Sequence, residues 1–220
     1  MCIRDRGWAR VALVPTDFDV AECPTIDPHR WVDRGPVTPG TGSGWREVLL
    51  DPVQEHLVEW AARMAPEAVP GARIPRQVQA GTLLKTMSDQ LAPRAILAFD
   101  YCSTTPEVAA RPQDEWLRTY VNHERGGPYH QAPGQQDITT EVCVDQLTDF
   151  FGAPELATQA DFLADLGIED LVAEGDAIWR ERAAIGDLEA LKARSRRREA
   201  EALTDPAGLG AFAVMQWRSG

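Results

Sequence analysis

The chain has 220 residues, of which 44% are hydrophobic and 25% are charged, and its net charge at pH 7 is -12. Such a chain can bury one sizeable core, so we expect one soluble globular domain, alone or with a subdomain. The acidic balance argues against nucleic acid as the main partner and is compatible with a basic protein or peptide. No apolar run approaches the roughly 20 residues that span a bilayer, and no signal-peptide core is visible, so the sequence predicts no membrane partner and a cytoplasmic location.

The cysteines and histidines are scattered. No Cys-x-x-Cys pair occurs, and no cysteine clusters with a histidine at metal-ligand spacing. The sequence therefore predicts reduced thiols and no metal site. The four cysteines are Cys2, Cys23, Cys102 and Cys143.

The start of the chain has little regular pattern. Met1 to Arg6 resembles an adapter-derived leader of translated contigs, so we expect native sequence to begin near Gly7. Residues 7–44 are predicted to be largely irregular, because Asp17 to Pro39 is dense in proline, aspartate and threonine. One short strand is expected from Arg10 to Val14.

A glycine-rich stretch, Gly40 to Gly44, follows. A nucleotide-binding glycine loop leaves a buried strand and opens a helix, so that backbone amides face the ligand. Here the next segment, Trp45 to Leu50, has the pattern of a strand. We therefore interpret the glycines as a flexible turn.

Two helices are predicted next. Asp51 suits an N-cap and Pro52 the first helical position, and Leu57, Trp60 and Met64 fall with Val53 on one face. A helix is expected from Pro52 to Met64, with this apolar stripe packed in the core rather than forming a ligand site. After several breakers, a second helix is expected from Gln77 to Leu91.

The run from Ala95 to Tyr101 is apolar and ends in a carboxylate and a phenol. Such runs are typical of strands buried on both faces in parallel sheets. Ligands lie beyond the carboxyl ends of these strands, which makes Asp100 and Tyr101 candidate site residues. A strand-end aspartate that caps a turn is the alternative.

A long polar connection extends from Cys102 to Gln136, and we expect a short helix within it, Asp114 to Asn122. His123 is a candidate proton carrier or substrate contact. The alternative is a surface or hydrogen-bonding histidine, because no partner is visible in the sequence.

The remaining sequence is predicted to be mainly helical. Asp137, Thr139 and Thr140 are candidate N-caps of a helix that continues to Phe150 or Phe151. A second helix begins after Thr158, buries Phe162, Leu163 and Leu166, and stops at Gly167. A long charged helix, Leu171 to Ala202, is interrupted near Gly186. Its basic run, Lys192 to Arg198, is interpreted as a solvated face rather than a nucleic-acid or membrane site. The last expected element is a strand, Ala211 to Trp217.

Six motifs in this order resemble the C-terminal portion of the MidA-type S-adenosylmethionine-dependent methyltransferases, relatives of a mitochondrial complex I assembly factor that methylates a protein arginine. The likeness extends from Gly44 to Trp217. The motifs are Trp45 to Val48, Phe99-Asp100-Tyr101, Tyr120 with His123, Gly134 to Thr139, Thr158 to Ile168, and Leu209 to Val214.

The resemblance implies an α/β class I methyltransferase fold, a mainly parallel Rossmann-like sheet with an antiparallel terminal strand, in residues 45–220. It implies S-adenosylmethionine as cofactor and a protein acceptor, with arginine as one possibility. A guanidinium acceptor needs a carboxylate that orients it. We assign catalytic roles to Asp100, Asp137 and His123, and substrate binding to Tyr101 and Thr139.

The chain also departs from the family pattern. Cys102 stands where the family has glycine, and Cys143 and Val144 stand where it has an Asp-Phe pair. The family's glycine-rich cofactor loop and its ribose-binding acidic residue map to no residue here. We therefore expect an N-terminally truncated methyltransferase, with no cofactor-binding residue assigned. The alternative is a non-catalytic module that docks a partner through its basic helix.

Overall fold

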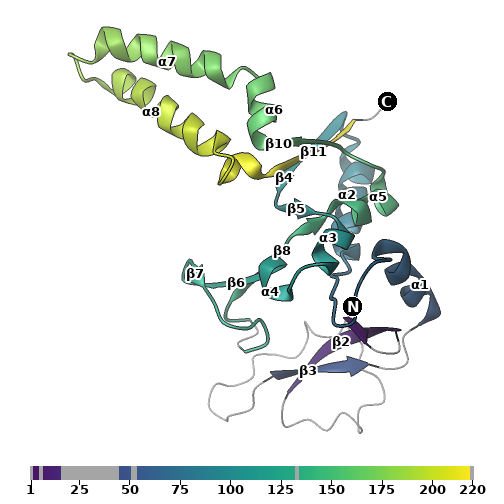
Figure 1. The fold of residues 1–220 in the computed structure, drawn as a ribbon. Coiled ribbons are helices and arrows are strands. Elements are labelled where there is room, and N and C mark those ends of the chain that lie inside the picture. Colours follow the sequence, from purple (N-terminus) through teal and green to yellow (C-terminus); the bar gives the residue numbers. More distant parts are fainter. Residues whose placement is uncertain (1, 5–6, 16–44, 51–53, 132–133, 219–220) are drawn as a thin grey trace. The chain divides into compact units, whose positions relative to one another are not determined.

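The computed structural model describes residues 2–4, 7–15, 45–50, 54–131 and 134–218, with side-chain surroundings from residue 54 onward. Residues 16–44 of the expected irregular segment, which include the glycine turn, and the predicted cap at Asp51 lie outside these residues. The chain forms two compact units, each made of separate segments: unit 1 contains Met1–Gln77 and Ser103–Gln146, and unit 2 contains Val78–Cys102 and Leu147–Gly220. Figure 1 shows the elements of both.

Unit 1 begins with an antiparallel sheet in the order β1-β2-β3. Its strands are β1 (Cys2–Arg4), β2 (Gly7–Pro15) and β3 (Trp45–Leu50). Arg10 pairs with Leu50 and Pro15 with Trp45, so β3 lies along the second part of β2, whose first residues pair with β1. The predicted strands Arg10 to Val14 and Trp45 to Leu50 are thus confirmed.

The core of unit 1 is built on α1 (Glu55–Met64), which buries Leu57, Ala61 and Met64 at helical spacing. Leu57 and Met64 of the predicted apolar stripe are therefore core, as expected, and Trp60 is half-buried against it, whereas Val53 lies outside the described residues. Ala61 joins a cluster of small side chains and Ile74, which is 1% exposed. A second cluster contains Val108, Trp116 and Cys143. Its residues come from α3 (Thr105–Ala109), α4 (Gln113–Trp116) and β9 (Val142–Cys143).

A small antiparallel sheet in the order β7-β6-β8 completes unit 1. Its strands are β6 (Leu117–Val121), β7 (Glu124–Arg125) and β8 (Asp137–Thr140). Two helix predictions are wrong here. The expected helix Asp114 to Asn122 is a single helical turn followed by β6, and the expected helix from Asp137 begins only at Val144.

Unit 2 is built around a three-stranded sheet in the order β10-β11-β4. Its strands are β4 (Ala95–Asp100), β10 (Glu155–Thr158) and β11 (Ala213–Arg218). β11 pairs antiparallel with both neighbours, so β4 and β10 run parallel to each other. The predicted strand at Ala95 is confirmed. Its predicted burial on both faces is wrong, because exposed and half-buried residues alternate along β4.

Helices cover parts of both sheet faces. On one face, Phe99 packs edge-on against Phe162 of α6 (Gln159–Asp165), with ring centroids 5.6 Å apart. On the other, Trp217 packs against Phe151 of α5 (Val144–Phe151) at 5.8 Å. α2 (Val78–Leu91) confirms the second predicted helix, and its Gly81 lies directly on Phe150.

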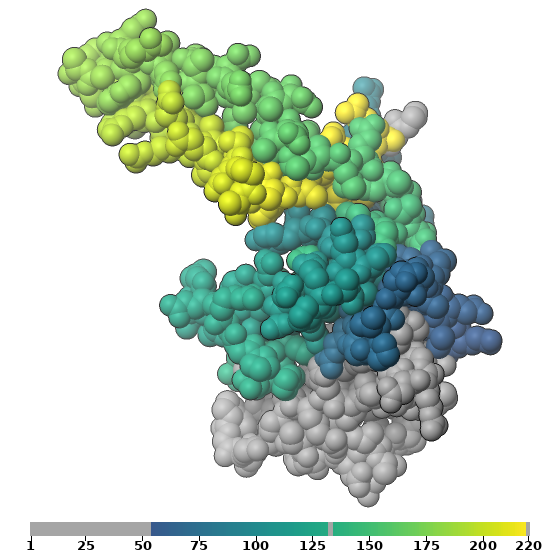
Figure 2. Space-filling model, viewed as in Figure 1, coloured from purple at the N-terminus to yellow at the C-terminus, as the bar shows by residue number. Residues whose placement is uncertain are grey.

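The predicted charged helix is a helical hairpin of α7 (Ile168–Arg182) and α8 (Leu188–Thr204), and the two helices lie side by side in Figure 2. Gly186, at φ +66°, makes the predicted interruption. Thr158 caps α6 and Gly167 takes the left-handed conformation, both as predicted. Leu166 is 67% exposed, so its predicted burial is wrong. A 3-10 turn, η2 (Leu209–Ala211), precedes β11.

Candidate functional site

Polar side chains share one face of the β7-β6-β8 sheet in unit 1. Tyr120 lies in register with Arg125 on one side and Asp137 on the other, and Arg118 lies opposite Thr139. Because side chains alternate along strands, these five residues are on the same face. The register thus brings together Asp137 and Thr139, two of the predicted site residues, and adds Tyr120, Arg118 and Arg125.

This face already holds a guanidinium group. Arg125 Cζ lies 5.8 Å from the centroid of the Tyr120 ring, a cation-π distance. Asp137 and Thr139 are both exposed beside this pair. The face therefore offers a carboxylate, a hydroxyl and an aromatic ring to solvent.

His123 lies at the end of this sheet rather than on its face. Asn122 and His123 form the two-residue turn between β6 and β7, with φ angles of 51° and 68°. Two successive left-handed residues are typical of the tight turns that join hairpins. The turn alone therefore accounts for the left-handed backbone conformation of His123. The side chain of His123 is exposed.

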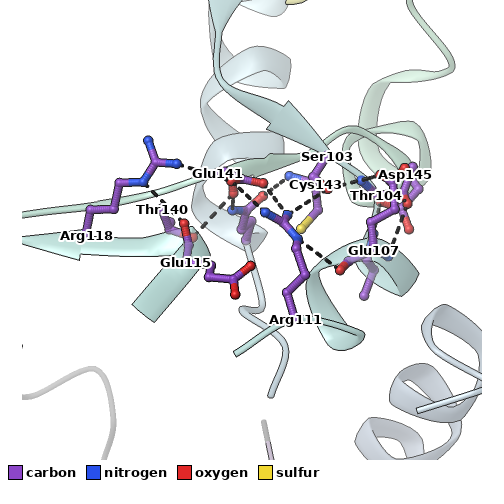
Figure 3. A network of polar contacts seen from close by, with 12 residues as sticks. Ser103, Thr104, Glu107, Arg111, Glu115, Arg118, Thr140, Glu141, Cys143 and Asp145 are labelled. Atoms are coloured by element: carbon purple, nitrogen blue, oxygen red, sulfur yellow. Dashed lines mark hydrogen bonds and ion pairs between the residues drawn. The ribbon is translucent and has the colours of Figure 1, made fainter. Parts of the chain in front are cut away.

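Glu141, directly after β8, is the centre of an ion-pair network (Figure 3). Its side chain is 12% exposed, and its two carboxylate oxygens accept hydrogen bonds from Arg111 at 3.1 and 2.5 Å. Arg118 Nη2 lies 3.8 Å from the same carboxylate. The hydrogen bond with Glu141 raises the pKa of the Arg111 guanidinium. Glu141 thus links Arg111 to the polar sheet face through Arg118.

The other end of the network is the N-terminus of α3. Thr104 and Glu107 form a capping box, in which each side chain bonds to the other residue's backbone amide. These hydrogen bonds from Thr104 lower the pKa of the Glu107 carboxyl. Arg111 Nη2 donates to Ser103 Oγ at 3.2 Å.

Sequence analysis missed this network. The Thr-x-x-Glu spacing of Thr104 and Glu107 signals a capping box. The pairing of Arg111 with Glu141 carries no local signal, because the residues are 30 positions apart.

The remaining predicted residues, Asp100 and Tyr101, lie at the end of β4 in unit 2. Asp100 Oδ1 accepts a hydrogen bond from the Tyr101 amide at 2.8 Å. The Tyr101 ring lies 4.3 Å from that of Phe212 and is 47% exposed. Asp100 therefore shapes its own turn, while Tyr101 presents its ring to solvent.

The described residues do not form a cradle for a nucleoside cofactor. Such a cradle uses glycines where a strand turns into a helix. The described glycines with positive φ are Gly71, Gly134, Gly152, Gly167 and Gly186, and none of them joins a strand to a following helix. The β10-to-α6 turn is made by Thr158 instead. Among the described residues, therefore, no positive-φ glycine leads from a strand into a helix.

Among the described residues, no group of three or more His, Cys, Asp or Glu side chains could hold a metal ion. None of the helices described combines the length and apolar character needed to cross a bilayer.

Comparison with solved structures gives two similar proteins from Burkholderia thailandensis. One is an uncharacterized COG1565 superfamily protein, with a TM-score of 0.68 and 20% identity, covering 99% of this chain and 50% of that one. The other is a COG1565 superfamily member, described as a "likely methyl transferase" and bound to S-adenosyl-homocysteine, with a TM-score of 0.67 and 21% identity, covering 99% and 49%. At this identity the likeness concerns the fold. The chain spans about half the length of either structure.

No curated protein matches the chain at a significant level. A family model described as "Putative S-adenosyl-L-methionine-dependent methyltransferase" matches residues 5–160. The match covers well over half of the chain and includes β4, the β7-β6-β8 sheet and the Glu141 network. The chain therefore belongs to this S-adenosyl-L-methionine-dependent methyltransferase family.

Proposed function

We propose that this chain is the acceptor-side part of a MidA-type, class I methyltransferase that uses S-adenosylmethionine and modifies a protein, with an arginine guanidinium as the first candidate acceptor. The observation that carries the proposal is the family match over residues 5–160. The cofactor loop is then supplied by sequence that this chain does not contain. The acidic chain, at a net charge of -12, suits a basic protein substrate.

The topology of unit 2 supports a class I, Rossmann-like fold. β4 and β10 run parallel, and the terminal strand β11 lies between them in the opposite direction. Helices lie against both faces, as in sheets built from parallel strands. This arrangement corresponds to the antiparallel terminal strand that the sequence motifs imply.

The acceptor side is proposed to be the polar face of β6 and β8. The Asp137 carboxylate can accept two parallel hydrogen bonds from a planar guanidinium and hold it in one orientation. Thr139, two residues further along β8, would bind substrate atoms next to the guanidinium through its hydroxyl group. The Arg125–Tyr120 contact supports this assignment, because it brings a guanidinium onto the ring of Tyr120, the residue opposite Asp137 in the sheet. Asp100, Tyr101 and His123 stay secondary candidates.

The test is a methylation assay on a protein that contains both this chain and the missing cofactor-binding half. Asp137→Ala should lower kcat/KM for an arginine-containing protein acceptor about ten- to hundredfold, as expected for loss of a charge-assisted hydrogen bond. Asp165→Ala, at the exposed end of α6, is the matched control and should leave the rate unchanged. Equal rates for the two variants would remove Asp137 from the site, and an absence of methyl transfer to any protein would reject the proposal.

A second candidate function is a partner-binding module. Residues 168–204 lie outside the family match, and the tip of this α7–α8 hairpin exposes Ile185 and Leu188 at 68% and 67%. The basic run itself is largely engaged inside the hairpin: Arg196 pairs with Glu174, Arg197 with Asp176, and Arg194 lies over Trp179. Docking by the hairpin would therefore use the apolar tip rather than the basic face.

A further inference from the structure

The outward face of α8 in unit 2 carries an apolar stripe. α8 packs against α7 through Ala190 and Ala193, which are both buried. Leu188, Leu191 and Ala202 recur at helical spacing on the opposite side of α8, and all three are exposed. Leu188 is 67% exposed and Leu191 52%, so the residues that the structure describes leave this stripe uncovered.

Two charged side chains flank the stripe. Lys192 and Glu199 are two helical turns apart, so they lie on the same side of α8, and both are exposed. At about 11 Å along the helix axis they are too far apart to pair with each other. Neither side chain has an ion-pair partner among the described residues, whereas Arg196 and Arg197 nearby pair with carboxylates of α7. Both charges are therefore available to a second molecule.

The two charges are arranged symmetrically along the helix. Lys192 and Glu199 are equally far from the point between Ser195 and Arg196. A second α8 that lies antiparallel across this point therefore places its Glu199 beside Lys192 and its Lys192 beside Glu199. A two-fold axis makes both contacts at once, which is the self-complementary pattern of a symmetric dimer.

The same register covers apolar residues at both ends of the stripe. Leu188 and Leu203 are also equally far from that point, so Leu188 of one copy lies next to Leu203 of the other. Both are exposed, Leu203 at 38%. The centre of the contact is Ser195, a small side chain whose hydroxyl donates to the Lys192 carbonyl at 2.9 Å. It needs no partner from the second copy and lets the two helices approach closely.

The charge of the hairpin favours a second copy over other occupants. Residues 168–204 contain nine acidic and seven basic residues, a net charge of -2, against -12 for the whole chain. The hairpin thus contributes little to the repulsion between two copies. Nucleic acid or an anionic membrane would need an unpaired basic face. Here Arg196 and Arg197 are paired with α7, and Arg194 lies over Trp179.

We propose that two copies of this chain associate through the outward face of α8, antiparallel, about a two-fold axis between Ser195 and Arg196. The family match ends at residue 160, so the whole of α8 lies outside it. The inference goes beyond methyl transfer and does not depend on it, and it names the partner that the hairpin binds. We define the α8 face as Leu188, Leu191, Lys192, Glu199, Ala202 and Leu203.

Sedimentation velocity of the 220-residue chain at increasing concentration tests the association. The parent should show a monomer–dimer equilibrium with a dissociation constant in the micromolar range, because the contact is a single helix face. Leu188→Asp should weaken the dimer by about a hundredfold or more, since symmetry places two carboxylates in the contact. An aspartate in the first turn favours the helix itself, so unfolding of α8 would not explain the loss. Leu171→Asp, on α7 of the same hairpin and at a residue 55% exposed, is the matched control and should leave the dimer unchanged.

Exchange of the two charges tests the register. Lys192→Glu and Glu199→Lys should each weaken the dimer by about tenfold, because one substitution sets two pairs of like charges side by side. The double variant should recover the dissociation constant of the parent. An equal mixture of the two single variants should form a heterodimer as tight as the parent dimer, because one chain then offers two glutamates and the other two lysines. No contact within one chain produces this recovery in the mixture.

Three outcomes would overturn the proposal. The first is a parent chain that stays monomeric at every concentration. The second is a Leu188→Asp variant that dimerises as tightly as Leu171→Asp. The third is a double variant, or a mixture of the single variants, that stays as weak as the single variants alone. Methyl transfer is measured in a separate assay, so rejection of either proposal leaves the other standing.

Discussion

Substitution of Glu141 by glutamine should destabilise unit 1 locally. Glu141→Gln keeps the side-chain volume but leaves the Arg111 guanidinium without its bidentate carboxylate partner. Loss of one partner of a fully buried ion pair costs about 3 to 5 kcal/mol. We expect roughly 2 to 3 kcal/mol, because Arg111 is still 32% exposed and regains some hydration.

The matched control is an exposed pair. Lys85 and Asp89 lie 3.1 Å apart on α2, with side chains that are 61% and 62% exposed. Asp89→Asn should cost at most about 0.5 kcal/mol, because solvent screens such pairs. The contrast between the two variants isolates the effect of burial from the effect of charge.

Native-state hydrogen exchange is the appropriate assay, because it reports each unit separately. The Cys143 amide donates to Gln77 Oε1 at 2.8 Å, and the Thr105 amide donates to Asp145 Oδ1 at 2.9 Å, so both report on the network. Their protection should fall by roughly thirtyfold or more in Glu141→Gln, which corresponds to about 2 kcal/mol. The reasoning is refuted if Glu141→Gln lowers the protection of these two amides no more than Asp89→Asn lowers the protection of the amides near Asp89.

Three further changes have expected outcomes. Gly210→Ala places a Cβ 2.4 Å from the Thr204 carbonyl carbon, and backbone atoms cannot rotate away as a side chain can. The substitution should therefore lower the free energy of unfolding by about 2 kcal/mol or more in urea denaturation, and an unchanged midpoint would contradict this. Hydrogen bonds with Thr104 lower the pKa of the Glu107 carboxyl, so they stabilise α3 at pH values above the ordinary pKa of 4.5 and are lost as the pH falls through the lower pKa of the folded protein. Amide exchange in α3 should accelerate in that pH range, and Glu107→Gln should remove this pH dependence. Thr158→Ala removes the α6 cap and should cost about 1 kcal/mol by denaturant titration, unlike the conservative Thr158→Ser.

The helices of this chain were largely predictable because their signals are local. The stripe of Leu57 and Met64, the cap at Thr158 and the break at Gly186 each depend on residues within a few positions. Such local signals do not depend on which distant segments the helix packs against.

The strands β6 and β8 of unit 1 were not predicted, because pairing across their sheet decides them. Leu117 to Val121 suits a helix or a strand, and its pairing with β8 selects the strand. Asp137 and Thr139 resemble helix caps, but Ile138 and two threonines in four residues favour an extended chain. The consequence for the site is large, because a strand places Asp137 and Thr139 on one face.

The residues of the candidate site were predictable only in part, because strand pairing also decides which of them share a face. Asp137 and Thr139 were found by motif, and their shared face came from the register with Tyr120 and Arg118. The Arg111–Glu141 pair joins distant positions, and nothing near either residue in the sequence indicates it. The assigned roles of Asp100, Tyr101 and His123 stay predictions.

The position of β11 has a consequence for how the chain folds during synthesis. β11 is the last of these three strands along the chain, yet it lies between β4 and β10 and supplies all the backbone pairing that either strand has within the described sheet. Until Ala213–Arg218 has left the ribosome, β4 and β10 lack their described pairing partner, and more than a hundred residues separate β4 from β11 along the chain. Contacts this distant along the chain form slowly and leave apolar strands open to wrong pairings. Ala213–Arg218 is therefore the segment that closes the described sheet of unit 2, and a nascent chain that stalls before this segment cannot form that sheet.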